Sequence, residues 1–73
     1  MYSFKVHQSI VEQRKSTFTE GRRVVLDKMD GENLPIGLMG TVAGVDDIGT
    51  IFVNWDNGSR LGVVYGADEC HIV

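Results

Sequence analysis

The sequence predicts a mainly β protein, namely a small five-stranded SH3-like barrel with a short N-terminal helix. Three observations lead to this prediction. Apolar and polar residues alternate in short segments after residue 21, which is the period of a half-buried strand. Glycine is frequent after position 31 and marks turns between the segments. The chain has only 73 residues, so we expect one domain, with residues 1–21 as tail and docked helix and residues 22–73 as the barrel.

A short helix is expected over residues 10–18. Ser9 and Glu12 match the capping-box pattern S-x-x-E, with Ser9 as N-cap. Val11 and Phe18 lie seven residues apart and form a narrow apolar stripe that can dock on the barrel. Gly21 is the expected stop. Residues 1–8 fit either an extra strand or a loose tail.

Five strands follow, and their spacing favours an SH3-like barrel over an OB-like one. An OB-like barrel usually needs longer strands and a helix between the third and the fourth, for which there is no room here. The long connection MDGENLPIGLMG after the first strand predicts a folded surface loop, and Gly44 predicts a bend or bulge. The strands are expected at residues 22–28, 40–46, 50–55, 60–64 and 70–73.

The stretch VNWDNGS decides which residues of the last hairpin are buried. A two-residue loop, Asn57-Gly58, would pair Trp55 with Arg60 and mix polar with apolar residues on one face. A three-residue loop with a bulged Gly58 pairs Trp55 with Ser59 instead. One face then holds Ile51, Val53, Trp55, Leu61 and Val63, and the other holds Phe52, Asn54, Arg60, Gly62 and Val64. Because a buried face selects the register, the sequence predicts the three-residue loop and a buried Trp55.

Composition and charge describe an ordinary globular chain with an uneven charge distribution. The net charge is −3, but residues 1–28 carry six bases and three acids, and residues 29–73 carry one base and seven acids. No apolar run approaches the ~20 residues of a membrane span, so no membrane is expected as partner. A single cysteine, Cys70, cannot form an internal disulfide and fits a reducing, cytoplasmic location.

The sequence does not predict an enzyme. Cys70 and His71 are adjacent, so in a strand they point to opposite faces and cannot form a nucleophile–base pair. Asp46-Asp47 lacks the spacing of a calcium loop and is typical of a turn. We therefore expect no catalytic residue, no metal and no cofactor.

Several motifs in one order resemble a known family. In order, they are the segment GRRVVLDKM, the tripeptide Gly40-Thr41-Val42 at the start of the second expected strand, the motif V-D-D-I-G, and the motif V-x-W-D-N-G-S followed by L-G-x-V. Together they resemble domain of unknown function 4314, a small bacterial and phage family, over roughly residues 10–73. The resemblance implies a fold and a bacterial or mobile-element context, and it implies no activity.

A second resemblance, to the Mind-bomb/HERC-type domain, suggests a peptide-binding SH3-like barrel. Sequences of that family contain G-T-V, then V-x-W-D-N-G, then a Tyr-Gly-Asp region. The family has an Arg after the Tyr, whereas this chain has Gly66 at that position. The matching positions are Gly40, Thr41, Val42, Val53, Trp55, Asp56, Asn57, Gly58, Tyr65, Gly66 and Asp68.

The favoured function is a non-catalytic accessory or adaptor module that binds a protein or peptide. The groove of an SH3-like barrel would lie between the long first loop and the adjacent hairpin, with Met29, Leu34 and Met39 on one side and Tyr65 opposite. The other interpretation is that these apolar residues cap an open end of the barrel. The chain is expected to be a monomer or a weak homodimer.

Nucleic-acid binding is the alternative function. Arg14, Lys15, Arg22 and Arg23 could form a basic corner between helix and first strand. The acidic second half of the chain opposes it, because acids repel a phosphate backbone. A third class is a phage-borne inhibitor of a host protein.

Overall fold

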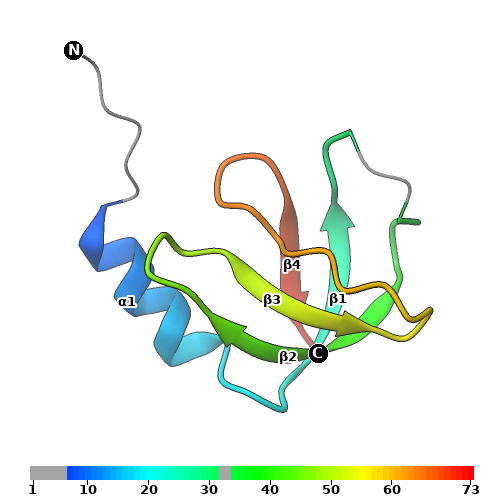
Figure 1. Cartoon of the computed structure of the whole chain (residues 1–73), viewed down its shortest axis with the longest axis horizontal. Helices are drawn as coiled ribbons and strands as arrows, with labels where there is room; N and C mark the ends of the chain where they lie inside the picture. Colours follow the sequence, from blue (N-terminus) through cyan, green and yellow to red (C-terminus); the bar gives the residue numbers. More distant parts are fainter. Residues whose placement is uncertain (1–6, 32–33) are drawn as a thin grey trace.

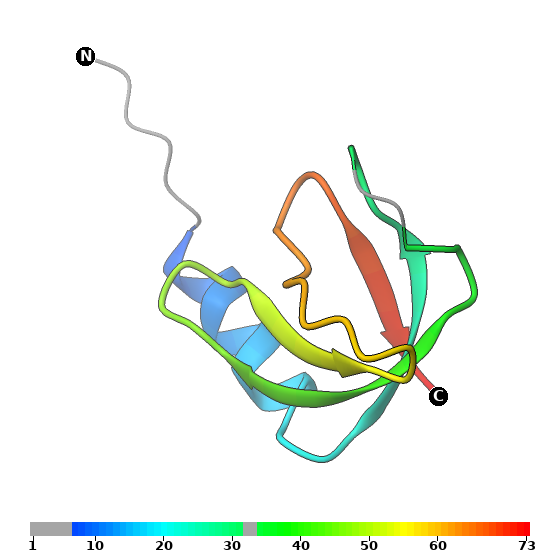
Figure 2. The ribbon, with the colours of Figure 1, turned by 45° about the vertical axis from the view of Figure 1, so that its right-hand side comes forward.

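The computed structural model describes residues 7–31 and 34–73. Within these residues the chain forms one helix and an antiparallel sheet in the order β3-β2-β1-β4. The elements are α1 (Gln8–Thr17), β1 (Arg23–Lys28), β2 (Met39–Val45), β3 (Ile51–Trp55) and β4 (Glu69–Ile72). The sheet bends so that β2 and β3 cross the direction of β1 and β4, and α1 lies beside β2 (Figures 1 and 2). The prediction of a mainly β fold with a short N-terminal helix is confirmed.

The core lies inside this bend and follows the period-two pattern. In β1 the side chains of Val24 and Leu26 are fully buried, and β3 buries every second residue from Ile51 to Trp55. Val11 of α1 is buried as well, and Phe18 packs against the core cluster. The helix is thus held by the two residues that its apolar stripe predicts.

The hairpin register agrees with the three-residue loop. The backbone N–H of Trp55 donates to the carbonyl of Ser59 at 2.9 Å, and Ile51 pairs with Val63. Gly58 has φ +91°, a conformation that glycine adopts without a steric penalty. Trp55 is only 3% exposed, so its predicted burial is confirmed.

The predicted fifth strand and the closed barrel are not found among the described residues. Residues 60–64 make a single bridge to β3, between Val63 and Ile51, and the sheet stays open between β3 and β4. The indole Nε1–H of Trp55 donates to the carbonyl of Leu61 at 2.9 Å. This side-chain bond occupies a carbonyl that a regular ladder would pair with backbone. Leu61, expected on the buried face, is 39% exposed.

The helix begins two residues earlier than expected. It starts at Gln8, and its N-cap is His7, whose Nδ1 accepts from the N–H of Ser9 at 3.1 Å. The S-x-x-E pattern therefore does not act as the predicted capping box, because an imidazole nitrogen has taken the role of the Ser9 hydroxyl. The helix ends at Thr17, before the predicted stop at Gly21.

The remaining sequence predictions concern loops and the tail. A register shift in the β2–β3 pairing between Val42 and Gly44 confirms the predicted bulge. The long loop returns to β1, where the N–H of Gly37 donates to the carbonyl of Leu26 at 2.8 Å. Of the proposed N-terminal strand or tail, residues 1–6 lie outside the described part of the chain.

Candidate partner-binding site

The four residues predicted to bind a partner lie in different surroundings. Met29 and Leu34 are partly buried and pack against the core cluster. Met39 is exposed on β2, and Tyr65 is exposed in the turn before β4. The Tyr65 ring lies under the Arg14 guanidinium, 5.1 Å from Cζ to the ring centroid, and lines a small hollow with residues of α1. Tyr65 therefore faces the helix, whereas Met29 and Leu34 face the core.

The basic corner is largely occupied by contacts within the chain. Arg14 donates to the carbonyl of Gly49 at 2.7 Å, and Lys15 pairs with Asp47 at 2.9 Å. These two contacts join α1 to the β2–β3 turn, which lies beside the helix in Figure 1. Arg22 is exposed on the surface.

Arg23, the fourth basic residue, binds the carboxylate of Asp56 with both terminal guanidinium nitrogens, Nη1 and Nη2. The two N–O distances are 2.8 and 2.6 Å, and the same side chain donates to the hydroxyl of Thr41 at 3.0 Å. The hydrogen bond from Arg23 lowers the pKa of Asp56 below its ordinary value of 3.8. Arg23 thus ties the hairpin turn to β1 and β2.

Asp56→Asn is expected to lower stability at neutral pH more than at acidic pH. A carboxylate whose pKa is lowered by folding stabilises the fold above pH 3.8, and this stabilisation is lost as the pH falls below that value. The effect is small because the pair is exposed to solvent. The urea midpoints of the two proteins should differ at about pH 7, and the difference should shrink as the pH is lowered below 3.8. A gap that is independent of pH contradicts this explanation.

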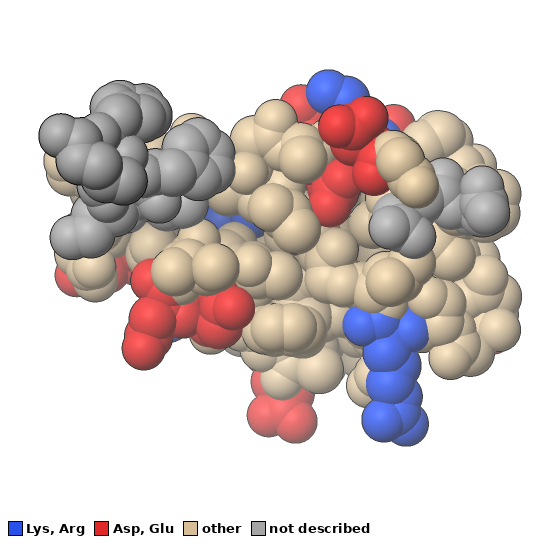
Figure 3. Space-filling view, turned by 45° about the horizontal axis from the view of Figure 1, so that its top comes forward, with Lys and Arg blue, Asp and Glu red and all other residues tan. Residues whose placement is uncertain are grey.

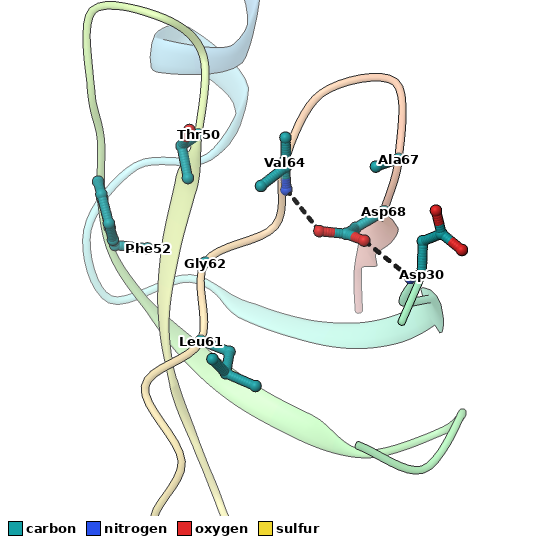
Figure 4. A pocket seen from close by; sticks show the side chains of 8 residues that line it. All are labelled: Asp30, Thr50, Phe52, Leu61, Gly62, Val64, Ala67 and Asp68. Carbon is teal, nitrogen blue, oxygen red and sulfur yellow. Dashed lines mark hydrogen bonds between the residues drawn. The ribbon is translucent and has the colours of Figure 1, made fainter. Parts of the chain in front are cut away.

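A hollow lies between β3, the segment after the hairpin turn and the start of the long loop. Thr50 and Phe52 stand on one side, Val64 and Asp68 on the other, and Leu61 lies below them (Figure 4). Asp30, from the first turn of the long loop, stands at the rim with its carboxylate directed outward (Figure 4). The hollow thus lies between the start of the long first loop and the adjacent hairpin, but none of the four residues predicted to bind a partner lines it.

Three large apolar side chains remain half-exposed in the lining of the hollow. Phe52, Leu61 and Val64 are 42%, 39% and 46% exposed. Isolated exposed apolar residues are normal on a protein surface, but several around one concave area are typical of a binding site. These three residues form what we call the apolar trio.

The wall of the hollow is held by a buried carboxylate. Asp68 is only 6% exposed, and its two oxygens accept from the backbone N–H groups of Val64 and Asp30, each at 2.9 Å (Figure 4). The side chain therefore connects the turn before β4 to the start of the long loop. Its role is to position the two sides of the hollow.

Asp68→Ala is expected to destabilise the fold by about 2–4 kcal/mol, because two backbone N–H groups lose their acceptor and each costs roughly 1–3 kcal/mol when buried without a partner. Asp68→Asn keeps one acceptor oxygen and is expected to lose about half as much. Urea denaturation followed by Trp55 fluorescence measures both. Equal stability of Asp68→Ala and the wild type would assign the carboxylate no structural role.

Cys70 and His71 do not form a reactive pair. Burial raises the pKa of the Cys70 thiol to about 11, so the thiol is protonated and poorly nucleophilic at neutral pH. His71 lies on the exposed side of β4, where its Nδ1 is 2.8 Å from a carboxylate oxygen of Asp27. The described residues include no group of three His, Cys, Asp or Glu side chains that could hold a metal ion. Over the same residues, no helix is both long and apolar enough to cross a membrane.

None of the four predicted residues, Met29, Leu34, Met39 and Tyr65, lines the hollow, and the sequence analysis missed the apolar trio. The predicted register puts Phe52 and Val64 on the outer face of the hairpin, and the structure agrees. The signal available in the sequence was that two large apolar residues, Phe52 and Val64, stand on a face that is expected to point outward. Leu61 could not be found in this way, because the predicted register puts it on the buried face, whereas it is 39% exposed.

Comparison with known proteins identifies a family. No curated protein and no solved structure matches the chain. A family model described as Domain of unknown function (DUF4314) matches residues 7–73, a range that includes α1 and all four strands of the described sheet. The chain therefore belongs to the DUF4314 family.

Proposed function

We propose that this chain is a non-catalytic accessory or adaptor module that binds a protein or peptide partner in the hollow between the long first loop and the hairpin. The observation that carries the proposal is the apolar trio, three half-exposed side chains that line one concave surface. A bound apolar side chain would remove this area from water, which is the main driving force of protein association. We place the module in the cytoplasm of a bacterium or phage-infected cell, which agrees with its single cysteine.

Two features support a binding role over catalysis. Both carboxylate oxygens of Asp68, in the wall of the hollow, accept hydrogen bonds from backbone N–H groups, so this side chain has a structural role. The thiol of Cys70 is held in its protonated form by burial. Neither group has the environment of an activated acid, base or nucleophile.

Nucleic-acid binding has weaker support. Arg14, Lys15 and Arg23 contact groups within the chain, so a phosphate would have to compete with Gly49, Asp47 and Asp56. A salt titration separates the two functions. Phosphate contacts make affinity fall steeply with salt, whereas apolar contacts do not.

The proposed site predicts which variants lose binding. The immobilised chain is exposed to a lysate of the source organism, with and without nuclease treatment, and captured proteins are compared between variants. Leu61→Ser should lose the captured partner by at least about tenfold, as expected for a central interface residue. Ile48→Ser is the matched control, because Ile48 is an apolar residue that is 65% exposed outside the hollow. Equal capture by both variants would show that the hollow is not the binding site. Capture that is lost after nuclease treatment would favour nucleic-acid binding.

A further inference from the structure

The hollow combines an apolar surface with uncompensated negative charge. The apolar trio lies beside two carboxylates, Asp30 at the rim and Asp68 in the wall, and the described lining contains no lysine or arginine. The two hydrogen bonds to Asp68 come from backbone N–H groups, which carry no net charge. Asp68 therefore has no positively charged partner in the described lining, at a place with little contact with water.

Positive charge is scarce in the half of the sequence that forms the hollow. Residues 29–73 contain seven acids and a single base, Arg60. Two bases of the first half are already paired with acids, namely Lys15 with Asp47 and Arg23 with Asp56. Figure 3 shows one face of the molecule on which acidic side chains stand at the top, left and bottom of a broad uncharged area, with basic side chains beside the acids at the top and at the lower right. A ligand of positive charge would be attracted to such a surface.

We infer that the occupant of the hollow is a basic peptide segment. One large apolar side chain packs against Phe52, Leu61 and Val64, and a neighbouring lysine or arginine lies near Asp30 and Asp68. The long stem of such a residue can follow the apolar surface while its charged end reaches the rim. An acidic peptide would bring like charges together at a partly dehydrated site, which is unfavourable. This inference rests on the proposed function and adds the chemistry of the partner.

Selection from a library of random peptides tests the inference. Displayed peptides of about twelve residues are selected on the immobilised full chain, a length sufficient to span such a groove. Enriched sequences are synthesised with blocked termini, and their affinities are measured by fluorescence anisotropy. We expect the enriched peptides to combine a large apolar residue with a nearby lysine or arginine and a net positive charge.

Variants of the chain then locate the contacts. Asp30→Asn should weaken binding about threefold to fivefold, the effect of one exposed charge pair. Glu20→Gln removes an exposed acid outside the hollow and should leave affinity unchanged. Leu61→Ser and Val64→Ser should weaken binding at least about tenfold, whereas Ile48→Ser should not. Buried-tryptophan fluorescence of each variant confirms that it is folded.

The possible outcomes distinguish failure of the basic-peptide inference from failure of the proposed binding function. Peptides that lose affinity with Leu61→Ser but carry no excess of basic residues, or that bind Asp30→Asn and Glu20→Gln equally, overturn the basic-peptide inference and leave the hollow as the site. Peptides that bind Leu61→Ser and Ile48→Ser equally, or a selection without enrichment, overturn the proposed function as well.

Discussion

Trp55→Ala is expected to leave the chain without a cooperative unfolding transition at room temperature. Trp55 is 3% exposed and belongs to the core cluster formed by residues of β1, β2 and β3 together with Val63. Replacing a buried tryptophan with alanine destabilises a protein by about 3–5 kcal/mol. A core of this size supplies only about 3–5 kcal/mol in total. The loss is therefore as large as the whole stability of the domain.

A second consequence of Trp55→Ala is the loss of the bond from the indole to the Leu61 carbonyl. Trp55→Phe separates the two effects, since it keeps most of the apolar volume and removes only the N–H donor. The phenylalanine variant should fold, with a loss of about 1–3 kcal/mol from the unpaired carbonyl and the smaller ring. Circular dichroism during heating and amide NMR dispersion measure both variants.

Phe52→Ala is the matched control for this experiment. Phe52 lies on the same strand but on its exposed face. Its replacement is expected to change stability by roughly 1 kcal/mol or less, since most surface substitutions have small effects. A native-like melt of Trp55→Ala, or a larger loss for Phe52→Ala than for Trp55→Ala, would contradict the packing described for β3.

The elements with a local pattern could be predicted from the sequence. Val24 and Leu26 in β1 and Ile51, Val53 and Trp55 in β3 alternate with outward residues, and one buried face determines both strand type and register. The hairpin loop followed from the same residues, because only the three-residue turn puts them all on one side. For these elements the local pattern and the tertiary packing agree.

Features that depend on long-range side-chain contacts could not be predicted in this way. Residues 60–64 show the alternation of a strand, but the Trp55 indole binds the Leu61 carbonyl and the ladder is interrupted. The basic corner looked free in the sequence, yet Arg14 and Lys15 contact residues 35 and 32 positions away. Met29 was predicted as a contact residue although it packs against the core, as a domain of this size needs most of its apolar side chains there.

Gly40→Ala is expected to destabilise the fold by roughly 3 kcal/mol, at the upper end of the range for overpacked cores. Gly40 is buried in β2 directly opposite Trp55. A Cβ atom on Gly40 would lie 2.5 Å from Cγ1 of Val53, 2.8 Å from Cε3 of Trp55 and 2.9 Å from the carbonyl oxygen of Asn54. The last neighbour is backbone, so β2 and β3 would have to separate.

The mechanism at Gly40 is steric, and a different glycine provides the comparison. Gly58 has a positive φ with no atom within 4 Å of its hypothetical Cβ, so Gly58→Ala introduces backbone strain without a clash. Such strain costs about 1–2 kcal/mol. Urea denaturation should therefore rank Gly40→Ala below Gly58→Ala in stability, and the reverse order would contradict the close approach of β2 to β3.

A double-mutant cycle identifies the clash directly. Val53→Ala removes the Cγ1 atom that lies nearest to the new methyl group. The penalty of Gly40→Ala should consequently be smaller in the Val53→Ala background than in the wild type, with a coupling of about 0.5–3 kcal/mol as found for residues in contact. Additive effects would mean that the alanine at position 40 acts through Trp55 or the backbone and not through Val53, since a clash with Val53 has to disappear when the side chain that causes it is shortened.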